Sequence, residues 1–129
     1  MTIRAVRGAT QLDFDDRGHL LDNVKTLVKE MLDANALDQD DLVGLIFTAT
    51  PDLRSEFPAV AARELGMGDV PLMCAQELDI AGSLPRVVRI LALAETELSK
   101  REIRHVYQGG AAALRTDLAP AAAGAGARE

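Results

Sequence analysis

The sequence predicts a single α+β domain in which helices cover one face of a mixed β-sheet. A chain of 129 residues fits one hydrophobic core, and 48% hydrophobic with 26% charged residues is the composition of an ordinary folded protein. Strand-like and helix-like apolar patterns follow in the order strand, helix, strand, helix and three further strands. We therefore expect one domain over residues 1–118 and a disordered Ala- and Gly-rich tail over residues 119–129.

The first half of the chain contains the most regular helix pattern. Residues 2–8 alternate as a short strand that ends at Gly8. Over residues 18–35, apolar side chains recur at one-, three- and four-residue spacings, which predicts a helix of about five turns with one buried stripe. The DQDD turn at 38–41 favours a brief capped helix. The apolar run at 42–50 then predicts a strand buried on both faces.

The second half contains a shorter helix and the remaining strands. Residues 57–65 predict the helix, and residues 70–78 predict an extended segment. The apolar run at 86–95 fits a strand or a helix, and its β-branched start favours a strand. A last strand over 103–115 is expected to be interrupted at its Gly-Gly pair by a bend or a bulge. An apolar sheet face that the helices leave uncovered would be buried by self-association into a closed oligomer.

The composition argues against several classes of partner. A net charge of −6 repels a polyphosphate backbone, and with three Phe, one Tyr and no Trp few rings can stack on bases, so no nucleic-acid partner is expected. The N-terminus shows no signal peptide and no apolar run is long enough to span a bilayer, which predicts a cytoplasmic protein without membrane contact. One cysteine and no Gly-rich phosphate loop suggest neither a metal nor a cofactor.

Arg89 is the most unusual residue of the predicted strands. It shares strand parity with Val87, Leu91 and Leu93, so a cation starts from the same face as three aliphatic side chains. Burying an unpaired ion is costly, so Arg89 must meet a protein carboxylate, a bound anion or water. An ion pair or a side chain that reaches solvent is about as well supported as an anion site.

Two further arginines occupy comparable positions. Arg7 shares a face with Ile3 and Ala5, and Arg115 closes the last predicted strand. Each alone is more simply a structural or solvated residue. Three arginines at strand positions of an acidic protein nevertheless indicate an anion site more strongly together than each does alone.

The remaining polar candidates carry weaker signals. Glu77 is most simply a surface carboxylate or the partner of an arginine, and Cys74 a small buried hydrophobe. His105 is most simply structural, and neither it nor His19 is close enough in sequence to Cys74 to suggest a nucleophile and its base. Tyr107 is equally compatible with packing and with recognition.

Besides the strand around Arg89, six motifs are distinctive between residues 3 and 118: IRAVRGAT at 3–10, TATPDL at 48–53, FPAVAAREL at 57–65, CAQELD at 74–79, IRHVY at 103–107 and LRTDL at 114–118. Together they resemble the monofunctional, trimeric α/β-type (AroH-class) chorismate mutases. The resemblance implies a mixed sheet with helices on one face, three chains that close a pseudo-α/β-barrel, and an active site at each subunit interface. It also implies the Claisen rearrangement of chorismate to prephenate, in phenylalanine and tyrosine biosynthesis, without a cofactor.

The same resemblance assigns roles to particular residues. Arg89 would contact the ether oxygen and a side-chain carboxylate of chorismate, and Arg7 and Tyr107 would hold that carboxylate. Glu77 and Cys74 would meet the ring hydroxyl. A fixed cation near the ether oxygen and a compact bound conformer are the main requirements of this reaction.

Other residues would complete the site. Arg63 and Phe57 would come from the neighbouring chain, and Leu114 with Arg115 would close the site near the C-terminus. An arginine suits these roles because its guanidinium is planar, permanently charged and able to bridge two oxygens.

Two alternative functions remain open at this point. One is a trimeric enamine or imine deaminase, which shares the general architecture but not the local motifs. The other is a non-catalytic sensor of an aromatic-pathway metabolite that uses the same arginines. Val60 and Met73 depart from the more polar residues that family members can carry at these positions, so we expect them to affect contacts at the rim of the site and the affinity more than the chemistry.

Overall fold

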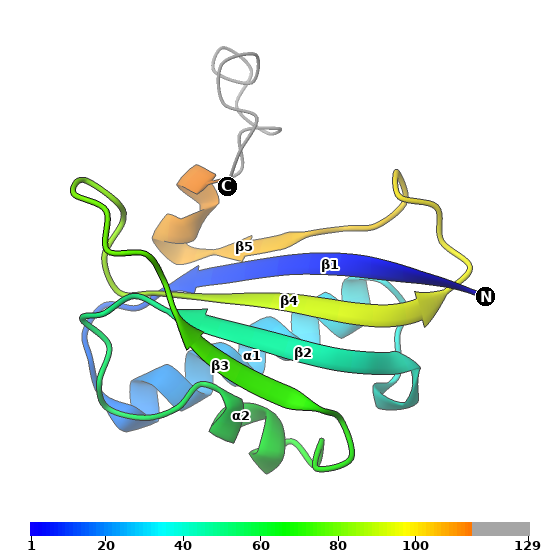
Figure 1. Cartoon of the computed structure of the whole chain (residues 1–129), viewed down its shortest axis with the longest axis horizontal. Helices are drawn as coiled ribbons and strands as arrows, with labels where there is room; N and C mark the ends of the chain where they lie inside the picture. Colours follow the sequence, from blue (N-terminus) through cyan, green and yellow to red (C-terminus); the bar gives the residue numbers. More distant parts are fainter. Residues whose placement is uncertain (115–129) are drawn as a thin grey trace.

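Two helices lie against one face of a mixed sheet in the computed structural model, which describes residues 1–114 (Figure 1). Within these residues the sheet has five strands in the order β3-β2-β4-β1-β5. The central pairs β2–β4 and β4–β1 are antiparallel, whereas the outer pairs β2–β3 and β1–β5 are parallel. The predicted α+β arrangement is thereby confirmed. The elements are β1 (Thr2–Gln11), α1 (Arg17–Ala34), η1 (Gln39–Asp41), β2 (Leu42–Ala49), α2 (Ala59–Glu64), β3 (Leu72–Gln76), β4 (Val87–Thr96), β5 (Val106–Gln108) and η2 (Gly109–Leu114).

Helix α1 agrees with its prediction to within one residue at each end. The Asp16 carboxylate accepts the backbone N–H of His19 at 2.9 Å and so caps the first turn. At the other end, the Asn35 side chain donates to the carbonyls of Met31 and Arg104, which ties the helix to the segment before β5. The buried stripe that holds the helix on the sheet consists of Leu20, Leu21, Val24, Leu27, Val28 and Met31. No helix in the described part of the chain is long and apolar enough to cross a membrane.

Strand β1 is longer than predicted, because it passes through Gly8 and ends at Gln11. A Cβ atom on Gly8 would lie 2.4 Å from Sδ of Met31, so the glycine lets α1 approach the strand closely. The glycine marks helix–sheet packing here, and the prediction that it ends the strand is wrong.

The last strand is shorter than predicted. Strand β5 covers only Val106–Gln108, and the chain then turns into the 3-10 helix η2 at Gly109, whose φ is +58°. A positive φ is accessible to glycine at little cost, so the Gly-Gly pair ends the strand instead of bending it. The predicted end of this strand at Arg115 lies outside the described residues, as does the predicted tail.

The two faces of the sheet differ in how they are covered. On the face under the helices, Leu45 and Phe47 of β2 are 3% and 0% exposed. On the opposite face, Ile46 and Thr48 are only partly buried, so the prediction that β2 is buried on both faces is wrong within one chain. We call these the helix-covered face and the open face.

One end of the open face has a cover of its own. Ala9, Val87 and Ala111 form a small buried cluster there, and Leu84 from the β3–β4 connection packs against it. The rest of the open face carries half-buried or exposed apolar side chains that belong to neither core cluster of the described residues: Ile3, Ile46, Met73, Leu91 and Leu93.

Candidate active site

A row of polar side chains crosses the open face where its covered end gives way to the exposed apolar part. In the strand register, Arg89 of β4 is opposite Ala9 of β1, and Ala9 is opposite Tyr107 of β5. Adjacent strands lie about 4.8 Å apart, so the backbones of Arg89 and Tyr107 are about 10 Å apart with only a methyl group between them. Arg7 lies two residues from Ala9 on the same face of β1. The register therefore places two cations and a phenol around Ala9, which is itself buried in the small cluster.

Glu77 provides one of the kinds of partner expected for Arg89, a protein carboxylate. Nε of Arg89 lies 3.5 Å from Oε2 of Glu77, and their side chains are 23% and 25% exposed. The hydroxyl of Thr48 donates a hydrogen bond to the same oxygen. The Glu77 carboxylate is thus a charged partner of Arg89 on the open face, so the ion pair that the strand position allowed is present.

The backbone of Arg7 is held by a histidine side chain. Nδ1 of His105 accepts the N–H of Arg7 at 2.9 Å, just before the parallel ladder of β1 and β5 begins at Gly8 and Val106. An acceptor at Nδ1 requires an imidazole without a proton on that nitrogen. The histidine predicted to be structural therefore contacts the main chain of a candidate site residue.

A second candidate region lies beside β3 and is named here the Phe57 hollow. It is a cavity of about 460 Å³ between β3 and the segment that follows β2, and it is lined by Ala49, Thr50, Leu53, Arg54, Ser55, Glu56, Phe57, Pro58, Cys74, Ala75 and Gln76. Phe57 is 67% exposed at this cavity. A volume of this size suits a small organic ligand.

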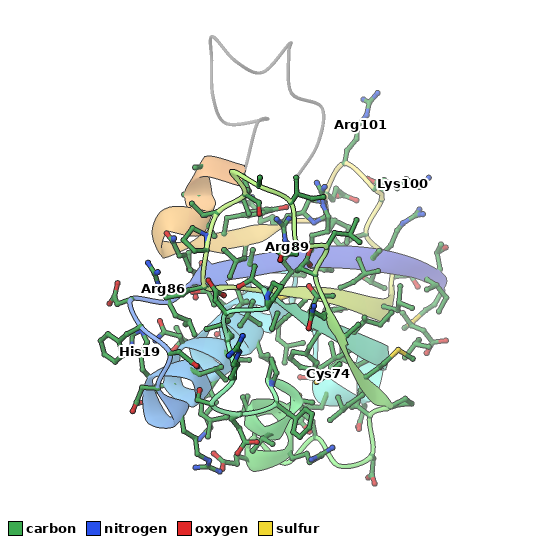
Figure 2. All side chains as sticks on the ribbon, turned by 60° about the vertical axis from the view of Figure 1, so that its left-hand side comes forward. His19, Cys74, Arg86, Arg89, Lys100 and Arg101 are labelled. Atoms are coloured by element: carbon green, nitrogen blue, oxygen red, sulfur yellow. The ribbon has the colours of Figure 1, made fainter. Side chains whose placement is uncertain are left out.

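The structure brings Cys74 together with Phe57 and separates it from the Glu77 carboxylate within one chain. Cys74 packs against the core of the helix-covered face. Glu77 extends the β2–β3 ladder, since its N–H donates to the carbonyl of Ala49 at 2.9 Å. Side-chain alternation then directs Cys74 and Glu77 to opposite faces. Figure 2 shows Cys74 beside β3 and Arg89 in a different part of the molecule.

Charged residues surround the Phe57 hollow as well. The Glu56 carboxylate accepts the backbone N–H of Phe57 at 2.9 Å and the Nε–H of Arg17 at 2.8 Å. These two contacts, in that order, hold the pKa of Glu56 below its ordinary value, and the nearby positive charge of Arg63 lowers this pKa further. Arg63 itself is exposed near the end of α2. The hollow thus has a cation of its own at its edge.

The other predicted site residues are placed as follows. Leu114 packs in the small cluster that also contacts Tyr107. Arg115 lies outside the described residues. Val60 packs against the core, and Met73 is 61% exposed on the open face.

Sequence reasoning missed Thr48. Its contact with Glu77 joins residues 29 positions apart, and it depends on the register between β2 and β3. The TATPDL motif contains this threonine, but a strand pattern alone does not show which residue of a neighbouring strand it meets.

Comparisons with known proteins agree on one family. Residues 3–118 match the family model described as chorismate mutase type I. The chain is 44% identical over 117 residues to chorismate mutase AroH of Thermus thermophilus, covering 90% of this chain and 96% of the relative. It is 39% identical over 119 residues to chorismate mutase AroH of Bacillus subtilis (strain 168), covering 92% and 94%.

A solved structure shows the same likeness in three dimensions. The chorismate mutase of Clostridium thermocellum superposes with a TM-score of 0.85 at 40% identity, covering 86% of this chain and 99% of that one. The match of family, sequence and fold extends over both the open face and the Phe57 hollow. The chain therefore belongs to the type I chorismate mutase family.

Proposed function

We propose that the polar row of the open face and the Phe57 hollow are two halves of one active site, joined between neighbouring subunits of a homotrimer. As a type I chorismate mutase, the chain converts chorismate to prephenate. The observation that carries the proposal is the separation of Cys74 from the Glu77 carboxylate on opposite faces of one chain. Within one chain the Phe57 hollow does not face Arg7 and Arg89. We propose that the hollow of a neighbouring subunit faces them instead.

The exposed apolar part of the open face supports the trimer. Ile3 and Met73 are 49% and 61% exposed, next to partly buried Ile46, Leu91 and Leu93. A continuous apolar surface of this kind is unfavourable in water and is typical of subunit interfaces. Closure of three sheets into a pseudo-α/β-barrel buries it.

The reaction makes only a few demands on the protein. One C–O bond of chorismate breaks as a C–C bond forms, so the enzyme must hold the compact conformer of the substrate and stabilise charge on the ether oxygen. Arg89 supplies the cation, and the carboxylate of Glu77 lies 3.5 Å from its Nε. Interactions that strengthen as the charge develops accelerate the reaction, whereas equal binding of substrate and transition state does not.

The other residues hold the substrate. Arg7 and Tyr107, on the open face, bind the side-chain carboxylate of chorismate. The carboxylate of Glu77 accepts a hydrogen bond from the ring hydroxyl of chorismate. Cys74 meets the same ring hydroxyl, and Phe57 and Arg63 approach from the neighbouring subunit. Leu114 and Arg115 close the site beside Tyr107, where Leu114 already packs.

The activity is tested with purified protein to which no metal or nucleotide is added. Chorismate should disappear, as followed by its ultraviolet absorbance, and prephenate should be the product by chromatography. Tight binding of chorismate without turnover would indicate a metabolite sensor and would contradict the catalytic role. The mass in solution, measured by light scattering, should be three times that of one chain.

A further inference from the structure

The carboxylate of Glu77 is oriented by two side chains that meet the same oxygen. Oε2 of Glu77 accepts the hydroxyl of Thr48 and lies 3.5 Å from Nε of Arg89. Among residues 1–114, neither the hydrogen bonds nor the ion pairs of this carboxylate use Oε1. The carboxylate therefore has one oxygen engaged by the protein and one available to a ligand.

The strand register explains why Thr48 meets this carboxylate. Thr48 of β2 is opposite Arg89 of β4 on one side and opposite Ala75 of β3 on the other. Glu77 follows two residues after Ala75, so its side chain leaves the same face of the sheet. Because Ala75 is small, nothing longer than a methyl group stands at the β3 position opposite Thr48. Thr48 thus lies on β2, between β4, which carries Arg89, and β3, which leads to Glu77.

The hydroxyl contributes an interaction that Arg89 alone does not. A carboxylate rotates readily about its last bond, and a cation near one oxygen restrains its position more than its rotation. A hydrogen bond from a fixed, β-branched side chain restrains that rotation, because the χ1 angle of threonine is itself stiff on a strand. Hydrogen bonds to an ionised acceptor are also among the stronger ones in proteins.

We propose that Thr48 is a positioning residue, which turns Oε1 of Glu77 toward the ring hydroxyl of the substrate. This inference rests on the proposed function, in which Glu77 accepts that hydroxyl. Thr48 does not touch the substrate. Its effect reaches the reaction only through Glu77.

A pair of substitutions at position 48 separates the hydroxyl from the shape of the side chain. Thr48→Val keeps the branched shape but removes the donor, whereas Thr48→Ser keeps the donor and removes only a methyl group. We expect kcat/KM for chorismate to fall about 10-fold in Thr48→Val and to stay within about threefold of wild type in Thr48→Ser. Thermal melting and light scattering should show the same fold and the same assembly in both variants.

A double-mutant cycle with Glu77→Ala distinguishes positioning from a structural role. In the Glu77→Ala background there is no carboxylate to orient, so adding Thr48→Val should change kcat/KM by less than about twofold. A chorismate analogue that lacks the ring hydroxyl should likewise lose its sensitivity to Thr48→Val. A 10-fold loss that persists in the Glu77→Ala background would show that Thr48 acts on the fold and would overturn the inference.

The outcomes also separate this inference from the proposed function. Chorismate turnover by the wild type, with equal kcat/KM in Thr48→Val, would overturn only the role of Thr48. Absence of turnover by the wild type would overturn both.

Discussion

The two faces of the sheet are built from the same strands but carry different kinds of residue. On the helix-covered face, β2 presents Leu45 and Phe47, which are buried against α1 and α2. On the open face, the same strand presents Ile46 and Thr48, and its neighbour β4 presents Arg89. The helix-covered face holds the fold together, whereas the open face, with fewer contacts inside one chain, carries the candidate chemistry. Substitutions on the helix-covered face should therefore lower mainly the stability, and substitutions on the open face mainly the activity.

The largest loss of stability is expected on the helix-covered face. Phe47 is the largest fully buried side chain of the described residues, at 0% exposure. Phe47→Ala should lower the free energy of unfolding by about 3–5 kcal/mol, because it removes buried apolar surface and leaves a cavity. Urea denaturation measures this change. A loss under about 1 kcal/mol would show that this face does not carry the core.

The largest loss of activity is expected on the open face. Arg89→Lys keeps a positive charge but loses the planar fork, so kcat should fall by about 10²- to 10³-fold. The melting temperature should stay close to that of wild type, because Arg89 packs in neither core cluster of residues 1–114. Steady-state kinetics and a thermal melt on the same sample measure both effects.

A matched control for Arg89 is available in an exposed loop. Arg101 lies between β4 and β5 and is exposed, away from the polar row (Figure 2). Arg101→Lys should leave kcat and the melting temperature unchanged. Wild-type kcat in Arg89→Lys would remove Arg89 from the catalytic role.

A smaller effect is expected at His105, which holds the backbone of Arg7. His105→Leu removes the acceptor, whereas His105→Asn keeps an oxygen acceptor near the position of Nδ1. If Arg7 binds a substrate carboxylate, KM should rise about 10-fold in His105→Leu with little change in kcat, and His105→Asn should recover most of the difference. Equal KM values in the two variants would show that the hydrogen bond does not position Arg7.

The smallest effect concerns Glu56, a partly buried carboxylate beside the Phe57 hollow. Its contacts lower the pKa of Glu56 in the folded state from the ordinary value of 4.5. Such a group adds stability above its unfolded pKa and loses that contribution as the pH falls through its folded pKa. Glu56→Gln should lower the melting temperature at pH 7 by no more than about 2 °C, since its partner Arg17 is exposed and solvent weakens the pair.

The pH dependence supplies the control for that variant. The melting temperatures of wild type and Glu56→Gln should converge as the pH falls below 4.5 toward the folded-state pKa. A difference that is the same at pH 7 and pH 3 would mean that ionisation of Glu56 is not its cause.

Local sequence patterns predicted the helices and strands of this fold better than they predicted the contacts between them. The boundaries of α1 and the order of the elements followed from apolar periodicity, which is a property of neighbouring residues. Gly8 was misread because a glycine that ends a strand and a glycine that lets a helix approach look the same in sequence. The Gly-Gly pair was misread because a positive φ at Gly109 ends β5 instead of bending it.

The candidate site was predicted as a set of residues but not as an arrangement. Parity alone placed Arg89 and Arg7 on strand faces with apolar neighbours, and the register bears this out. The contact of Thr48 with Glu77 and the grouping of Cys74 with Phe57 depend on which strands pair and at which offset. That information is not local, so no spacing along the chain reveals it.

The central claim is that each active site joins the open face of one subunit to the Phe57 hollow of another, and mixing two inactive variants tests it most directly. Arg7→Ala damages the open face and Arg63→Ala damages the edge of the hollow, so each variant alone should show little turnover of chorismate. After subunit exchange at equal amounts, about a quarter of the interfaces should pair two intact halves and restore about that fraction of wild-type activity. Mass spectrometry of differently tagged chains confirms the exchange. Hybrid assemblies without recovered activity would contradict a site shared between subunits.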